Sequence, residues 1–172
     1  MKKNKLGIII LTILLIFSTA VLLYSEDKDD AMQREVLTTH NKYRAELNIP
    51  PLIWSKKLAT NAGKWAHHLA HSDGRLYHSK GSGEGENLWQ GTAGYFSYSD
   101  KVEAWGREKK YFKKGVFPQV STSENWSDVG HYTQMIWRDT THVGCATVSV
   151  GNYDILVCRY SPPGNYIGKK VY

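Results

Sequence analysis

The chain has 172 residues, 41% of them hydrophobic, and a formal net charge of +6. About 150 residues beyond any leader suffice for one domain with a single core. Three of the 22 lysines and arginines lie in the basic start of the chain, which leaves 19 against 16 acidic residues and a charge of +3 on the domain. So small an excess argues against a nucleic-acid-binding protein.

The N-terminus is predicted to direct export. Three lysines precede an uncharged, apolar run over residues 6–24, which is the pattern of a secretory signal peptide. The run is also long enough, at about 20 residues, to span a bilayer. Residues 1–25 are therefore either a cleaved signal peptide or a retained anchor that brings the chain into contact with a membrane. In both cases the domain is secreted or extracytoplasmic, and it follows a mobile, acidic stem at residues 26–35.

Two helices are expected at the start of the domain. The apolar spacing predicts a helix over residues 30–47, which Pro50 and Pro51 end because proline lacks the donor that a continuing helix needs. Ser55 is predicted to cap a second helix that runs to about Ser72. The side chains expected to face the core are Leu58, Ala62, Trp65, Ala66 and Leu69.

The middle of the chain is predicted to be loop followed by two further helices. The segment Asp73–Tyr98 is rich in glycine and serine, which indicates a loop for most of its length. Ser99 is predicted to cap a third helix, Asp100–Lys114, and Asp128 to cap a short fourth helix that His131 opens.

Two strands are predicted to follow, over residues 142–150 and 154–160. If Gly151–Asn152 is a two-residue turn, Cys145 faces Cys158 directly, which suits a disulfide in an oxidising compartment. A slip of one residue in the turn would place the side chains on opposite faces, so a disulfide and two buried thiols both stay open. Helices followed by strands predict an α+β protein in which helices cover a sheet.

Four motifs resemble those of the CAP superfamily, which comprises cysteine-rich secretory proteins, antigen five and pathogenesis-related proteins. They are His40–Arg44, Gly85–Leu88, Gly130–Thr140 and Ile155–Tyr166. They occur in the family's order, and the resemblance makes residues 36–172 a CAP domain closest in pattern to the plant pathogenesis-related class. It implies a three-layer α-β-α sandwich with an antiparallel sheet.

The resemblance also implies a central cleft that holds two histidines and two acids, here His78, Glu86, Glu108 and His131. Two imidazoles and two carboxylates suit Zn²⁺ or another divalent metal with an open position for water. No activated nucleophile accompanies them, so no catalytic residue is assigned, and a metal-dependent hydrolase built on these four residues is the alternative. The same residues could instead form a hydrogen-bonded network that joins loops to helices.

Two aromatic stretches beside the third predicted helix are the candidate ligand-binding surface. Their residues are Tyr95, Phe96, Tyr98, Tyr111, Phe112 and Phe117. Lysines interleave with the aromatic residues of the second stretch, a composition that suits a membrane interface or the lip of an apolar pocket. Some CAP relatives bind sterols or fatty acids through such surfaces. Ordinary packing beneath the loops is the other interpretation.

Together these patterns predict an exported CAP-domain protein that binds a small lipid or sterol, a metal or a protein partner rather than converting a substrate. Residues 162–172 resemble a segment that some plant relatives release as a signalling peptide, although Val171 stands where that pattern has proline. The resemblance also speaks against a bond between Cys145 and Cys158. Plant relatives usually pair cysteines at these positions with others that this chain lacks.

Overall fold

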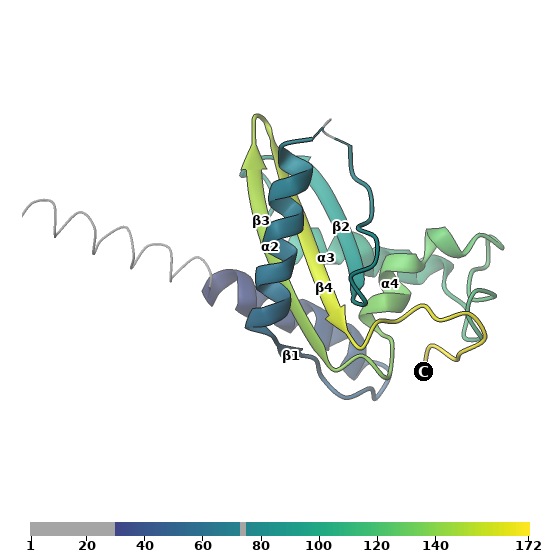
Figure 1. Ribbon diagram of the computed structural model, residues 1–172. Helices are drawn as coiled ribbons and strands as arrows, with labels where there is room; N and C mark the ends of the chain where they lie inside the picture. Colours follow the sequence, from purple (N-terminus) through teal and green to yellow (C-terminus); the bar gives the residue numbers. More distant parts are fainter. Residues whose placement is uncertain (1–29, 73–74) are drawn as a thin grey trace, which may run out of the picture. The chain divides into compact units, whose positions relative to one another are not determined.

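The computed structural model describes residues 30–72 and 75–172 (Figure 1). The predicted leader and residues 26–29 of the stem lie outside the described residues. The chain divides into two units, residues 1–34 and 35–172. The second holds the sheet and every side chain discussed below. Within the described ranges, no helix combines the length and apolar character that crossing a bilayer requires.

The first helix covers residues 30–45, so the described part of the predicted stem is helical. It ends in a turn in which the backbone N–H of Ile49 donates to the carbonyl of Arg44 at 3.0 Å. Asn48 takes a φ of 54°, a left-handed conformation that commonly closes helices. The two prolines that follow keep the chain from resuming the helix.

The second helix, α2 (Lys56–Ala70), forms as predicted. The side chain of Ser55 accepts a hydrogen bond from the backbone N–H of Leu58 at 3.3 Å and so caps the first turn. Most of the predicted stripe is buried, and Trp65 is half-buried. The cluster that the helix forms with the sheet consists of Ala62, Ala66, Leu69, Leu88, Ile155 and Val157.

The sheet has four strands in the order β1-β3-β4-β2. They are β1 (Ile53–Trp54), β2 (Gly85–Thr92), β3 (His142–Val150) and β4 (Tyr153–Ser161). The last three are antiparallel, as expected, whereas the two-residue edge strand β1 runs parallel to β3. The sheet is therefore mixed rather than purely antiparallel.

The predicted hairpin is confirmed, with its turn at residues 151–152. Cys145 stands directly opposite Cys158, with Cα atoms 4.1 Å apart, and the two form a disulfide. Both side chains are fully buried. Of the two possibilities left open by the sequence, the structure contains the bond rather than two thiols.

Helices cover both faces of the sheet, which gives the three layers that the resemblance implied (Figure 1). Ile155 and Val157 of β4 point toward α2. The alternate residue Tyr160 points to the other face, where its ring centroid lies 5.7 Å from that of His40 in the first helix. On that face the indole N–H of Trp105, in α3 (Tyr98–Gly106), donates to the carbonyl of Leu88 at 3.1 Å.

The prediction of a loop over most of Asp73–Tyr98 is wrong where β2 lies. The glycines of this segment are typical of loops, so the sequence did not indicate a strand. In the structure, neighbouring side chains lie so close to Gly85 and Gly91 that no larger residue fits there. A Cβ atom on Gly85 would lie 2.2 Å from the side chain of Gln134, and one on Gly91 would lie 2.4 Å from the ring of Trp89. Pairing with β4 along all eight residues stabilises the strand despite its composition.

The third helix also differs from its prediction. It begins at Tyr98, because Ser97 rather than Ser99 forms a capping box with Asp100. It ends at Gly106 and continues as a short 3-10 helix, η1 (Arg107–Tyr111).

Candidate functional site

Glu108, on η1, closes the N-terminus of the signature helix α4 (Gly130–Met135). Its Oε2 accepts hydrogen bonds from the backbone N–H groups of His131 and Tyr132, both at 3.0 Å. The first N–H groups of a helix have no partner within it, and a carboxylate there is doubly favourable because that end carries partial positive charge. The predicted cap, Asp128, does not do this: it lies in η2 (Trp126–Asp128) and accepts a bond from Ser123.

The imidazole of His131 is oriented by the same carboxylate. Its Nδ1 donates to Oε1 of Glu108 at 2.6 Å, so the other ring nitrogen, Nε2, is left for another partner. The ring stacks on Trp105 with centroids 5.9 Å apart and an interplanar angle of 17°. About a third of the side chain is exposed, so a solute can reach it.

A second histidine–carboxylate pair joins the glycine-rich loop to β2. His78 Nδ1 donates to Oε1 of Glu86 at 2.6 Å, and the backbone N–H of Ser79 donates to the same oxygen. The guanidinium of Arg159 lies 2.9 Å from the other oxygen. Burial acts to raise the pKa of Glu86, but the bond from His78, the charge of Arg159 and the bonds from Ser79 outweigh it and lower the pKa. Glu86 is therefore an ionised, buried anchor for an exposed histidine.

The four predicted cleft residues thus form two separate pairs rather than one ligand set. Each carboxylate is already occupied, Glu108 by backbone amides and Glu86 by Arg159. Within residues 30–72 and 75–172, no three histidine, cysteine or acidic side chains are grouped so that they could hold a metal ion. This arrangement does not fit the four-ligand zinc site, and the assignment of a metal stays an untested prediction.

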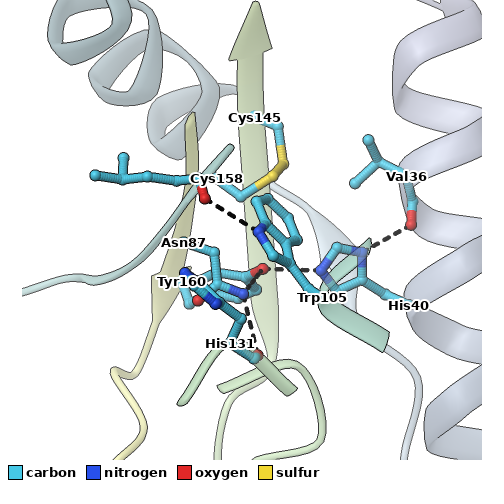
Figure 2. The surroundings of a disulfide bond; sticks show 9 residues. Val36, His40, Asn87, Trp105, His131, Cys145, Cys158 and Tyr160 are labelled. Atoms are coloured by element: carbon cyan, nitrogen blue, oxygen red, sulfur yellow. Dashed lines mark hydrogen bonds between the residues drawn. A yellow bond between two sulfur atoms is a disulfide. The ribbon is translucent and has the colours of Figure 1, made fainter. Parts of the chain in front are cut away.

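A chain of buried polar groups connects the signature helix to the first helix (Figure 2). His40 bonds the carbonyl of Val36 through Nδ1 at 2.8 Å and the hydroxyl of Tyr160 through Nε2 at 2.9 Å. Asn87 Nδ2 donates to that hydroxyl and to the carbonyl of His131, at 3.1 Å each. Burial lowers the pKa of His40 to about 4. The backbone position of His131 is therefore tied to the interior of the domain.

Arg44 holds the C-terminal part of the signature motif against the first helix through hydrogen bonds to backbone carbonyls. This buried guanidinium donates to the carbonyls of Pro50, Met135, Trp137 and Thr140 at 2.7–3.0 Å. Burial lowers the pKa of Arg44 to about 10. In the sequence, His40 and Arg44 stand out only as parts of a family motif. Three of the carbonyls that Arg44 contacts lie more than ninety residues away along the chain, so a single sequence does not indicate these hydrogen bonds.

The first aromatic stretch forms an exposed cluster against β2. The ring of Phe96 contacts that of Trp89 at a centroid distance of 5.2 Å and that of Tyr95 at 4.9 Å. Tyr95 is 77% exposed and Phe96 is 36% exposed. Tyr98 is half-buried, with the ammonium of Lys101 5.2 Å from its ring centroid. We call Trp89, Tyr95 and Phe96 the aromatic surface.

The second aromatic stretch is mostly interior. Phe117 is only 4% exposed and packs against Trp126 and Trp137, with centroids 5.3 and 6.3 Å away. Phe112 is half-buried, and its ring lies 5.4 Å from that of Tyr132. Of the three predicted residues, Tyr111 is the most exposed, at 42%. The six residues therefore lie in two settings and do not form one lip.

Residues 37–160 match the family described as "Cysteine-rich secretory protein family" (CAP). Pathogenesis-related protein 1C of Nicotiana tabacum is 39% identical over 141 residues, which cover 81% of this chain and 80% of that protein. Pathogenesis-related protein PRMS of Zea mays is 36% identical over 173 residues, 98% of each.

Solved structures show the same fold. Na-ASP-1 is 25% identical with a TM-score of 0.68, over 83% of this chain and 41% of that one, so the present chain spans less than half of it. NaASP2, solved with Zn²⁺, is 21% identical with a TM-score of 0.68 over 83% of this chain and 85% of that one. BmVAL-1 is 23% identical with a TM-score of 0.69 over 83% and 82%.

Proposed function

The chain belongs to the CAP family of cysteine-rich secretory proteins, and we propose that it is an exported protein that binds a sterol or another small lipid on its aromatic surface. The basic, apolar N-terminus and the Cys145–Cys158 disulfide support export, because disulfides persist in oxidising compartments. CAP domains share their fold more closely than their function, so the site has to carry the rest of the proposal.

The observation that carries it is the exposure of Tyr95 at 77% in ring contact with Phe96, which in turn rests on Trp89. Touching aromatic rings that face solvent are a typical mark of a recognition surface. The loop that presents them is fixed at both ends. The backbone N–H of Gly94 donates to Asp154 at 3.2 Å, and the capping box at Ser97 starts α3. A surface held in place in this way loses little conformational entropy when a ligand binds.

The hydrolase alternative receives less support from the two histidine–carboxylate pairs. A metal-dependent hydrolase needs an open metal position with free ligands, or a nucleophile beside a base. Glu86 and Glu108 are both engaged by other groups, and the two cysteines are bonded to each other. These contacts favour a binding protein in which the two acids hold neighbouring segments in place rather than take part in a reaction.

Binding of the fluorescent sterol dehydroergosterol and of a labelled fatty acid to the purified protein tests the proposal. Tyr95→Ser and Phe96→Ser should each weaken binding by about fivefold or more, because each removes apolar contact area. Tyr166→Ser, at a 52% exposed tyrosine outside the aromatic surface, is the matched control and should bind normally. Unfolding curves of all three variants should stay within about 0.5 kcal/mol of the wild type. Failure of the wild type to bind either probe would contradict the proposal.

A further inference from the structure

A pocket of about 660 Å³ is lined by residues that belong neither to the two histidine–carboxylate pairs nor to the aromatic surface. Three segments line it: residues 114–116, residues 138–139, and Lys169, Lys170 and Tyr172. Its lining side chains include Lys114, Arg138, Lys169 and Lys170, with Asp139 as the single acid. The side chains that line this pocket thus carry four positive charges and one negative charge, in a domain whose overall excess is only +3.

The walls of the pocket are held together by backbone contacts although they lie outside regular helices and strands. The N–H of Arg138 donates to the carbonyl of Val171 at 2.9 Å, and the Val171 side chain is buried. Val116 and Lys170 form an isolated antiparallel bridge. The basic side chains therefore project from a fixed frame rather than from loose chain.

None of the four cations of this pocket forms an ion pair with a described residue, although Asp139 lies in the same lining. The ammonium of Lys114 lies 4.3 Å from the ring centroid of Tyr172. Among the described residues, three other lysines form ion pairs, as Lys42 does with Glu103 at 2.9 Å, whereas the exposed Lys56 and Lys57 of α2 form none. Like charges gathered around one hollow repel each other, and a bound anion relieves that repulsion.

We propose that this pocket binds an oxyanion, the phosphate or sulfate group of a small ester or of a lipid headgroup. The guanidinium of Arg138 offers the paired donors that match a tetrahedral oxyanion, and the lysines add point charges around it. The hollow is far larger than a lone anion, since one water occupies only about 30 Å³ of liquid. Val116 and the ring of Tyr172 provide apolar wall for the group that carries the charge. This site is independent of the proposed sterol surface.

The test uses the full chain with two probes, phenyl phosphate in solution and phosphatidylcholine vesicles that contain phosphatidic acid, at about 0.15 M salt to screen long-range attraction. The pocket variant is Arg138→Gln with Lys170→Gln. Its matched control is Lys56→Gln with Lys57→Gln, which makes the same change in net charge at exposed lysines of α2. We expect the pocket variant to lose about tenfold or more in affinity and the control to stay within about twofold.

The two probes distinguish the sources of the oxyanion. Binding of phenyl phosphate assigns the pocket to a soluble ester, and binding of the vesicles alone assigns it to a lipid headgroup. If both double variants lose affinity equally, attraction to net charge explains the binding and the proposal is overturned. Absence of binding of either probe to the wild type overturns it as well. If the pocket variant does not fold, Lys114→Gln with Lys169→Gln takes its place in the same comparison.

Discussion

His40 and Tyr160 form a buried hydrogen bond of 2.9 Å whose direction is fixed by a third group. The carbonyl of Val36 can only accept, so the Nδ1 that it contacts must carry the proton. Nε2 is then the acceptor, and the Tyr160 hydroxyl donates to it. The Tyr160 oxygen in turn accepts from Asn87. This sequence of bonds requires a neutral imidazole, which agrees with a pKa of about 4 for His40.

The first prediction concerns acid stability. The pKa of His40 is lowered from 6.5 to about 4. Between these two pH values the imidazole is therefore protonated in the unfolded chain and neutral in the folded chain. The stability contribution is complete above about pH 6.5 and is lost as the pH falls toward 4, by about 3 kcal/mol in total. Between about pH 7 and pH 5 the wild type should lose about 2 kcal/mol more than His40→Gln in urea unfolding. Parallel pH profiles would contradict the prediction.

The second prediction concerns the cap of α4. Glu108→Ala removes the acceptor of two backbone amides and of His131, and should lower the free energy of unfolding by about 2–3 kcal/mol. Asp128→Ala, which removes the cap that the sequence suggested, should cost less than about 1 kcal/mol because Asp128 bonds exposed loop groups. Urea unfolding of the two variants measures both values, and the reverse order would show that Glu108 is not the cap.

The third prediction concerns Arg44. Arg44→Lys should destabilise the domain by about 3 kcal/mol or more, because a single ammonium cannot reach the four carbonyls that the guanidinium contacts. Arg107→Lys, at an exposed arginine, is the control and should stay within about 0.5 kcal/mol of the wild type. Similar melting temperatures for the two variants would argue against the anchoring role of Arg44.

The fourth prediction concerns the cysteines. Thiol labelling of the denatured, unreduced protein should find no free sulfhydryl, because Cys145 and Cys158 are bonded. The two residues are 13 apart in sequence, so reduction should lower stability by about 3 kcal/mol through the added freedom of the unfolded chain. A variant with both cysteines replaced by alanine should show no change in stability when reductant is added. Two labelled thiols in protein recovered from an oxidising compartment would contradict the bond.

The fifth prediction concerns metal in the cleft. Since the two histidine–carboxylate pairs are separate and their acids are engaged, Zn²⁺ should shift the melting temperature of the wild type and of His131→Ala equally. Thermal unfolding over a zinc titration measures this shift. A zinc-dependent increase found in the wild type alone would instead support the metal site expected from the sequence.

Local patterns in the sequence were enough to predict α2 and the hairpin. Ser55 caps an apolar stripe, and Gly151–Asn152 separates two strands, so each element is specified within a few residues of itself. The resemblance supplied the three layers and named the histidines and acids of the cleft. Strand β2 was missed because its glycines are required by side chains that come from elsewhere, such as Gln134.

The roles of the cleft residues could not be predicted, because they depend on partners that are remote in sequence. Glu108 lies 23 residues from His131 of the helix that it caps, and neither residue type nor spacing indicates that connection. Arg44 reaches across more than ninety residues to backbone carbonyls, which are the same in every sequence. The family motifs indicated candidate residues for the cleft, whereas tertiary contacts determine which of them anchor other segments and which remain accessible.

The contacts of the last eleven residues determine what cutting the chain would do. Gly164 donates to Gln134 at 2.9 Å, Asn165 accepts from Thr133 at 2.7 Å, and Val171 is buried. A protease that cleaved ahead of Pro162 would therefore produce a nicked protein whose two pieces travel together until denaturant separates them. Shedding this segment as a free peptide would first require local opening around Val171, so dissociation rather than cleavage would set the rate of its release.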